Sequence, residues 1–170
     1  MRIHTNLTGL AAAVVLCGAV PALAQQMPEG SQVVIPEPPA GMGQIVFFRP
    51  GSMMGMAMGC QVNEGVGTPD ETKLSSLGSG KYFVLQTTPG THEFWVRNER
   101  TDALTLLVEP DETQFVRCRI KMGLISGRPD IVPEDAATFV AASDDLELVD
   151  DDDMLAVGVL RAAQMGPAAQ

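Results

Sequence analysis

Short hydrophobic runs separated by turn signals occupy the middle of the chain. Residues 45–48, 82–85 and 94–96 are apolar runs of strand-forming residues. Proline and glycine within residues 88–91 suit a type II turn, and residues 109–112 give a second turn signal. Strand-like segments with turns about 8–12 residues apart are typical of antiparallel sandwiches and barrels. The pattern predicts an all-β fold, an antiparallel β-sandwich of about seven or eight short strands.

Two stretches of this region alternate between kinds of side chain. One strand face of residues 54–62 would carry Met54, Met56, Met58, Cys60 and Val62. The two faces of residues 115–122 would carry Val116, Cys118, Ile120 and Met122 on one side and Phe115, Arg117, Arg119 and Lys121 on the other. Period-2 spacing predicts a strand in each stretch, and the second strand has an apolar face and a basic face.

The first residues carry the pattern of a secretory signal. Arg2 precedes an apolar run over residues 7–20, and residues 22–24 have the small-x-small form of a signal-peptidase site. The run is shorter than the ~20 residues that a membrane-spanning helix needs. A lipid anchor on Cys17 is the other alternative, but the cysteine lacks the small residue that normally precedes it. We expect cleavage after Ala24 and a periplasmic or secreted mature protein without a membrane span.

Composition divides the mature chain into three parts. Residues 25–43 are rich in proline and glycine and predict an extended, weakly ordered leader. Residues 44–143 hold the predicted sandwich domain, which is long enough to bury a core. Residues 144–170 form an acidic tail.

The structure of the C-terminal part is left open by its sequence. Residues 134–143 fit a short helix, with acids at its start, or a last edge strand around residues 138–140. The acids of residues 150–153 favour a solvated, disordered segment, whereas residues 154–165 could form a marginal helix. We therefore expect a disordered or partly helical tail.

The charge pattern limits the classes of partner. The formal net charge is −10, and most of the excess acid lies after residue 133. Nucleic acid is excluded as a partner because phosphate binding needs a basic face. The basic row of Arg117, Arg119 and Lys121, with Arg128 nearby, is the local exception. It could bind an acidic partner or the chain's own tail, or it could be the solvated side of a half-buried strand.

The methionine-rich stretch is the sharpest chemical feature of the sequence. Thioether and thiolate are soft ligands that suit Cu(I), so a site could be built from Met54, Met56, Met58 and Cys60. The same spacing would also line one face of a strand with core side chains. Val62 continues that face with a residue that cannot bind metal, which favours packing.

Catalytic and other metal sites find little support. His92 is the one histidine after the signal segment, and no Gly-x-Ser-x-Gly elbow accompanies it. The acids between residues 144 and 153 lack the alternation and glycine of a calcium loop. The sequence predicts neither an enzyme nor a cofactor.

Two cysteines, Cys60 and Cys118, remain in the mature chain. Secretion places them in an oxidising space, and each falls on the apolar face of its predicted strand. We expect a disulfide between them, although the sequence cannot give their separation. Two buried free thiols are the alternative.

Four short motifs, in order, resemble a small bacterial envelope family known as domain of unknown function 2846. They are Phe47-Phe48-Arg49-Pro50, then residues 77–83 ending in Gly80-Lys81-Tyr82-Phe83, then Pro89-Gly90-Thr91-His92, then Val116-Arg117 with Lys121-Met122-Gly123 and Gly127-Arg128-Pro129. The resemblance implies a β-sandwich-like domain of the cell envelope with no established activity, and no residue roles come with it.

Together these observations favour an exported, non-enzymatic envelope protein. It would be a binding or structural β-sandwich module whose partner is an envelope protein or a cell-wall component. The alternative is a periplasmic Cu(I)-binding protein that uses the methionine-rich strand.

Overall fold

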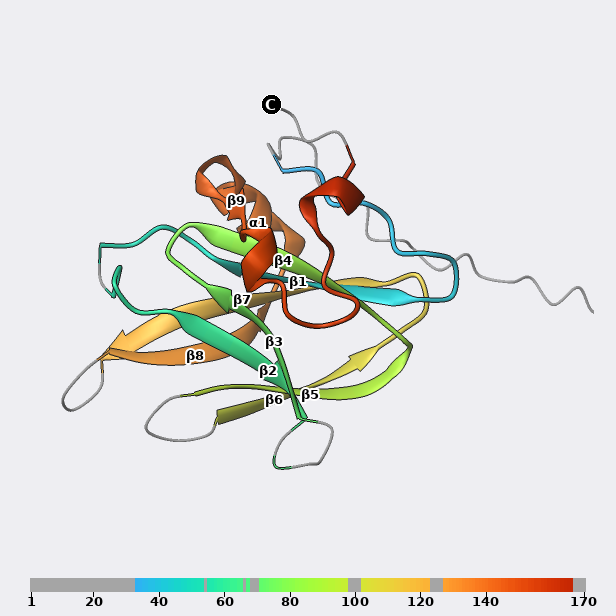
Figure 1. The fold of residues 1–170 in the computed structure, drawn as a ribbon, viewed down its shortest axis with the longest axis horizontal. Coiled ribbons are helices and arrows are strands. Elements are labelled where there is room, and N and C mark those ends of the chain that lie inside the picture. Colours follow the sequence, from blue (N-terminus) through green and yellow to red (C-terminus); the bar gives the residue numbers. More distant parts are fainter. Residues whose placement is uncertain are drawn as a thin grey trace, which may run out of the picture.

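The computed structural model describes residues 33–53, 55–65, 67, 71–97, 102–122 and 127–166. The predicted signal peptide and the first part of the leader lie outside the described residues. Two stacked β-sheets make up the body of the described protein (Figure 1). The predicted all-β sandwich is therefore confirmed.

Sheet A has the strand order β8-β7-β1-β4-β9, and sheet B has the order β3-β2-β5-β6. The strands of sheet A are β1 (Gly43–Arg49), β4 (Lys81–Thr87), β7 (Thr113–Met122), β8 (Gly127–Glu134) and β9 (Glu147–Leu148). The strands of sheet B are β2 (Cys60–Glu64), β3 (Thr72–Leu77), β5 (Gly90–Val96) and β6 (Asp102–Val108). Neighbours are antiparallel except for the β1–β7 and β4–β9 pairs, which are parallel.

Strand β1 is buried at every position because both faces of sheet A are covered there. Ile45 and Phe47 point between the two sheets, whereas Val46 and Phe48 point to the outer face of sheet A. A strand buried on both faces is a continuous apolar run rather than an alternating one. This explains the apolar run at residues 45–48.

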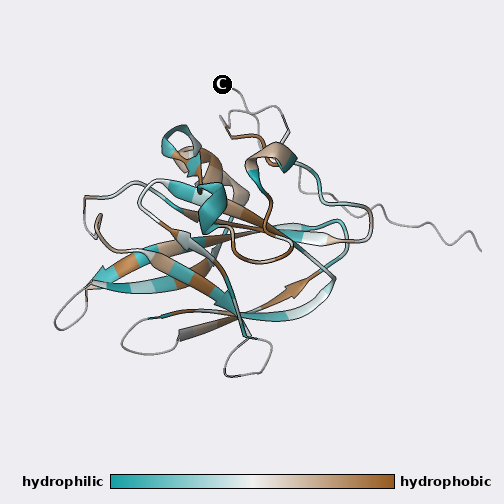
Figure 2. Ribbon diagram, viewed as in Figure 1, coloured by the Kyte–Doolittle hydropathy of each residue, from teal (hydrophilic) through white to brown (hydrophobic). Residues whose placement is uncertain are grey.

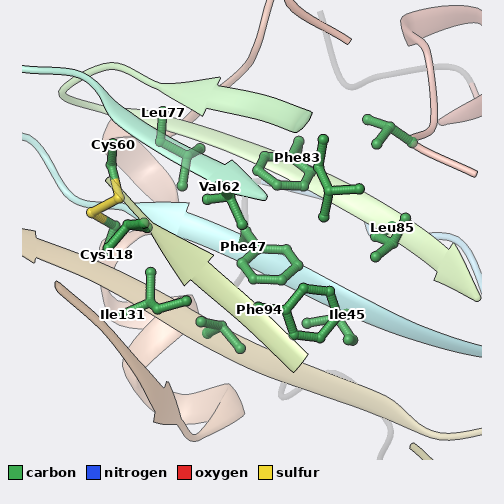
Figure 3. Packing of buried hydrophobic residues seen from close by; sticks show 14 of the residues in the cluster. Ile45, Phe47, Cys60, Val62, Leu77, Phe83, Leu85, Phe94, Cys118 and Ile131 are labelled. Atoms are coloured by element: carbon green, nitrogen blue, oxygen red, sulfur yellow. A yellow bond between two sulfur atoms is a disulfide. The ribbon is translucent and has the colours of Figure 1, made fainter. Parts of the chain in front are cut away.

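The first core fills the space between the sheets (Figure 3). The ring of Phe47 stacks on Phe83 at 4.9 Å between centroids and meets the edge of Phe94 at 5.2 Å. These three rings come from β1, β4 and β5, so they join sheet A to sheet B. Aromatic pairs in such geometries add to the stabilisation that burial alone provides.

The second core lies on the outer face of sheet A, beneath α1 (Ala136–Ala142). Phe139 of this helix meets Phe48 and Phe115 at 5.3 and 5.2 Å between ring centroids. The Asp135 side chain caps the helix by accepting a hydrogen bond from the backbone N–H of Thr138. The short-helix alternative for residues 134–143 is therefore confirmed, and the edge strand around residues 138–140 is wrong.

The acidic tail is not disordered over its described residues. Strand β9 pairs with β4, and the backbone N–H of Leu160 donates to the carbonyl of Val84. The side chains buried from this segment are Leu146, Val149, Met154, Val159, Leu160 and Met165. Residues 154–165 form turns, a bridge and one 3₁₀ turn rather than the predicted marginal helix. The boundary drawn after residue 143 is wrong, because residues 144–166 help to build both cores.

The described end of the leader is extended, as expected, but it is packed. Val33 and Ile35 are buried in the second core. Gln44 also donates a side-chain hydrogen bond of 2.7 Å to the carbonyl of Pro36. The weakly ordered leader expected over residues 25–43 is therefore wrong for residues 33–42.

The strand predicted over residues 54–62 is wrong for residues 55–59. Strand β2 covers only the end of this stretch, and the preceding residues turn at Gly55, whose φ is 69°. The buried guanidinium of Arg49 donates hydrogen bonds to the carbonyls of Gly55 and Leu77 at 2.6 and 3.3 Å, and also to Met58. The Arg49 side chain thus supplies hydrogen-bond donors to loop carbonyls that would otherwise need donors from a neighbouring strand.

Candidate binding surfaces

The methionine series does not line one strand face. Met56 is 61% exposed on the loop before β2, whereas the sulfur of Met58 lies over Gly127 of β8. Met54 lies outside the described residues. Cys60 is bonded to another cysteine, so it offers no thiolate to a metal. The predicted Cu(I) set therefore lacks its strongest ligand, and the predicted core stripe is also wrong.

Cys60 of β2 and Cys118 of β7 join sheet B to sheet A (Figure 3). Their sulfur atoms are 2.13 Å apart, and their Cα atoms are 6.6 Å apart. Both residues are buried in the first core. The predicted proximity of the two cysteines is confirmed, and their separation is within the range of disulfides.

His92 is held by acceptors on both sides of its ring. Its Nδ1 lies 2.6 Å from a carboxylate oxygen of Glu64, and its Nε2 lies 2.8 Å from the carbonyl of Thr88. The hydroxyl of Thr87 is 3.5 Å from Nε2. This distance is too long for a hydrogen bond through which His92 could activate the hydroxyl as a nucleophile. A ring nitrogen that donates to a carbonyl cannot act as a general base. We interpret His92 as a link between β2 and the β4–β5 turn.

The basic row of β7 lies on the outer face of sheet A, beyond the end covered by α1. Figure 2 shows hydrophobic and hydrophilic residues alternating along β7 and β8. We call the exposed or half-buried cations at this end of the two strands the basic face: Arg117, Arg119, Lys121 and Arg128. The two acids that lie among them are Asp130 and Glu134.

Asp130 is the anchor of the basic face. Its carboxylate is buried and accepts hydrogen bonds from Arg119 Nε at 2.8 Å and Lys121 Nζ at 2.7 Å. Burial by itself would raise the pKa of Asp130. The hydrogen bonds and charges of Lys121 and Arg119 outweigh burial and hold the pKa below its ordinary value.

The basic face still carries more positive charge than its acids neutralise. Lys121 stands directly opposite Arg128 in the β7–β8 register, and like charges in that position destabilise a sheet. The Nε atoms of Arg117 and Arg128 are buried and have no hydrogen-bond partner among the described residues. Buried donors without partners are rare in folded proteins and mark places where an ion, water or ligand can bind.

Replacing Asp130 with asparagine is expected to lower the free energy of unfolding at neutral pH by about 1–2 kcal/mol, because Arg119 and Lys121 lose their shared carboxylate. A lowered folded-state pKa contributes stability above the ordinary aspartate pKa of 3.8, and that stability is lost as the pH falls through the folded-state pKa. The difference between Asp130→Asn and the unchanged protein should therefore shrink in acid. Urea unfolding at several pH values measures it. The exposed Asp144→Asn variant is the control, and an equal loss there would contradict the assignment.

The acidic tail does not neutralise the basic face. Its described ion pairs run from Lys81 of β4 to Glu147 at 3.2 Å and to Asp150 at 3.8 Å. The tail therefore lies along the β4–β9 edge of sheet A, whereas β8 is at the opposite edge. Carboxylates of Asp150, Asp152 and Asp153 come within 4.8 Å of one another, but all three residues are exposed.

A separate open groove of about 680 Å³ lies between β6, the start of β7, the end of β8 and the start of α1. Its apolar lining includes Leu106, Phe115 and Pro133. Acidic side chains also line it, namely Glu112, Glu134 and Asp135. The groove forms where the fold brings residues 106–115 against residues 133–137, and the local pattern of neither stretch indicates it.

No protein-family model, curated protein or solved structure matches this chain. The resemblance to the envelope family named above therefore stays a prediction. Among the described residues, no helix has both the length and the apolar character needed to span a membrane.

Proposed function

We propose that this protein is an exported envelope module that binds an anionic cell-wall polymer through the basic face and does so without catalysis. The observation that carries the proposal is the excess of cations on β7 and β8. It includes Lys121 opposite Arg128, and two buried Nε donors that have no partner among the described residues. Carboxylate or phosphate groups bound along the row would offset the like charges of Lys121 and Arg128 and accept hydrogen bonds from the guanidinium groups.

Export is supported by two features that come from different parts of the molecule. The N-terminal pattern is that of a signal peptide. The buried Cys60–Cys118 pair joins the two sheets, and such bonds form and persist in oxidising compartments.

A polymer fits the basic face better than a folded acidic protein does. The cations of β7 recur at every second residue, so a roughly linear row of charge is repeated about every 6–7 Å along the strand. A stable protein interface needs an apolar, water-excluding centre within a polar rim. The row itself consists of charged side chains, which suits an extended chain of repeated anions.

The chain's overall negative charge does not oppose this interaction. The acidic tail lies at the opposite edge of sheet A, across five strands spaced about 4.8 Å apart. Exposed charges are largely screened beyond about 8 Å at physiological salt. The local charge of the basic face therefore determines its ligand.

Cosedimentation with purified, protein-free cell walls tests the proposal. The mature protein should bind the walls at low salt and be released by added salt. Lys121→Gln combined with Arg128→Gln should weaken binding roughly tenfold or more, since each lost contact contributes on the order of 1 kcal/mol.

The matched control combines Lys73→Gln in β3 and Arg97→Gln directly after β5, which removes the same charge from exposed positions away from the basic face. This control should bind like the unchanged protein. Equal weakening in both double variants, or equal binding to neutral dextran, would refute the basic face as the site. Binding to walls that retain their proteins, without binding to the protein-free walls, would point instead to an acidic envelope protein.

A further inference from the structure

Three of the four sheet edges of the sandwich carry features that block the pairing of another strand. Strand β8 contains Pro129 and Pro133, which have no N–H to donate. Strand β9 has only two residues. Strand β3 is covered in part by the tail, because the N–H of Leu155 donates to the carbonyl of Leu74 at 3.0 Å. Natural proteins protect their sheet edges in these ways.

Among the described residues, strand β6 is the edge that carries none of these three features. It forms a ladder with β5 over all seven of its residues and contains no proline, lysine or arginine. Ala103, Thr105 and Leu107 are exposed on its outer side, and Leu107 is 62% exposed. Of the outward backbone groups of β6, the carbonyl of Leu107 accepts from the side chain of Gln114 rather than from a strand. An apolar edge strand whose outer backbone groups are not paired with another strand is a template for pairing with another chain.

The orientation of the β6 backbone can be read from one hydrogen bond. The side chain of Gln114 donates to the carbonyl of Leu107 at 2.7 Å, so this carbonyl points away from β5. In an antiparallel ladder, the N–H and C=O of one residue point to the same side, and alternate residues point the same way. The backbone groups of Ala103, Thr105 and Leu107 are therefore directed to the open edge.

The groove described above lies beside this edge. A strand added to β6 would direct every second side chain into the groove, next to Leu106 and Phe115. Glu112, Glu134 and Asp135 line the same groove. Of these, Glu134 forms an ion pair with Arg117 at 3.7 Å. A long cationic side chain suits this mixture, because its aliphatic stem can pack on the apolar wall while its charge meets the carboxylates.

We propose that β6 and the adjoining groove bind an extended peptide segment of a partner protein by strand addition. The segment carries Lys or Arg at the positions that enter the groove and apolar residues at the alternate positions, which lie beside Leu107. Backbone hydrogen bonds supply affinity in such recognition, and the alternate side chains supply specificity. This site is separate from the basic face and does not depend on the proposed function.

The probe is a fluorescent peptide of about seven residues in which Lys alternates with Val, matching the length of β6. Fluorescence anisotropy should show binding to the mature protein at low salt, and a peptide of alternating Glu and Val should not bind. Thr105→Pro removes an N–H at the open edge, while the ladder with β5 stays intact. Leu107→Lys places a cation where the peptide lies. Each variant should weaken binding at least tenfold.

Leu155→Lys is the matched control, since Leu155 is 51% exposed away from β6 and should tolerate lysine without loss of binding. Thermal unfolding checks that each variant is folded. If Thr105→Pro does not fold, Leu107→Lys alone tests the edge. Equal binding of the Lys and Glu peptides would overturn the proposal, as would binding unchanged by both edge variants. A dimer of the protein itself that Thr105→Pro converts to monomer would overturn it in favour of a second copy of this chain.

Discussion

Replacing Cys60 and Cys118 together with alanine is expected to lower the free energy of unfolding by about 4 kcal/mol. The bond joins residues separated by 58 positions. Closing a loop of that length removes on the order of 4 kcal/mol of chain entropy from the unfolded state. The bond also ties β2 of sheet B to β7 of sheet A, so its loss removes a covalent link between the two layers, which the first core still holds together.

Urea unfolding of the mature protein, followed by near-ultraviolet signals of its aromatic core, measures this difference. The reduced, alkylated form of the unchanged protein provides a second comparison, because it loses the bond without losing the side chains. Both forms should unfold at lower urea than the oxidised protein, and the m-value of the cross-link-free chains should rise. A difference below about 1 kcal/mol would show that the bond does not constrain the unfolded chain.

The sandwich and its disulfide could be predicted because both depend on local period-2 patterns. Val116 and Cys118 alternate with polar residues along β7, and this parity alone directs them into the first core. The apolar runs that became β1 and β4 also needed no knowledge of distant contacts. Their burial on both faces, however, depends on α1 and the tail, which the strand pattern does not contain.

The methionine stretch shows why alternation is not sufficient. Glycine and methionine permit a strand but do not enforce one, because glycine adopts turn conformations at low cost. The guanidinium of Arg49 then holds the loop through the carbonyls of Gly55 and Met58. This arginine lies at the end of β1 and donates hydrogen bonds to the backbone of the loop. Such bonds are not visible in the hydrophobic pattern of the sequence.

The basic face could be predicted in part. The period of Arg117, Arg119 and Lys121 placed them on one side of a strand, and that prediction agrees with their exposure or partial exposure on sheet A. Their anchoring by Asp130 required the β7–β8 register, which sets Asp130 opposite Arg119. The groove beside β6 required the whole tertiary fold.

The prediction of a disordered acidic tail was wrong because it relied on the block of acids at residues 150–153. These acids are indeed exposed, but Val149 and Met154, which flank them directly, are buried. A short segment can present acids to solvent and insert single apolar side chains into a core without any helical or strand period. Only the contacts with β3 and β4 show which side chains are inserted.

Replacing Met154 with alanine is expected to lower the free energy of unfolding by about 3 kcal/mol, because the change leaves a cavity in the first core. Met154 is 2% exposed and packs between the sheets, whereas its neighbour Leu155 is 51% exposed. Leu155→Ala, the matched control, removes a side chain of similar size and should change stability by less than about 0.5 kcal/mol. Urea unfolding of both variants gives the comparison. Equal, small effects of the two substitutions would mean that the tail does not pack on the sandwich in solution, whereas a large effect of Met154→Ala alone would establish residues 144–166 as part of the domain.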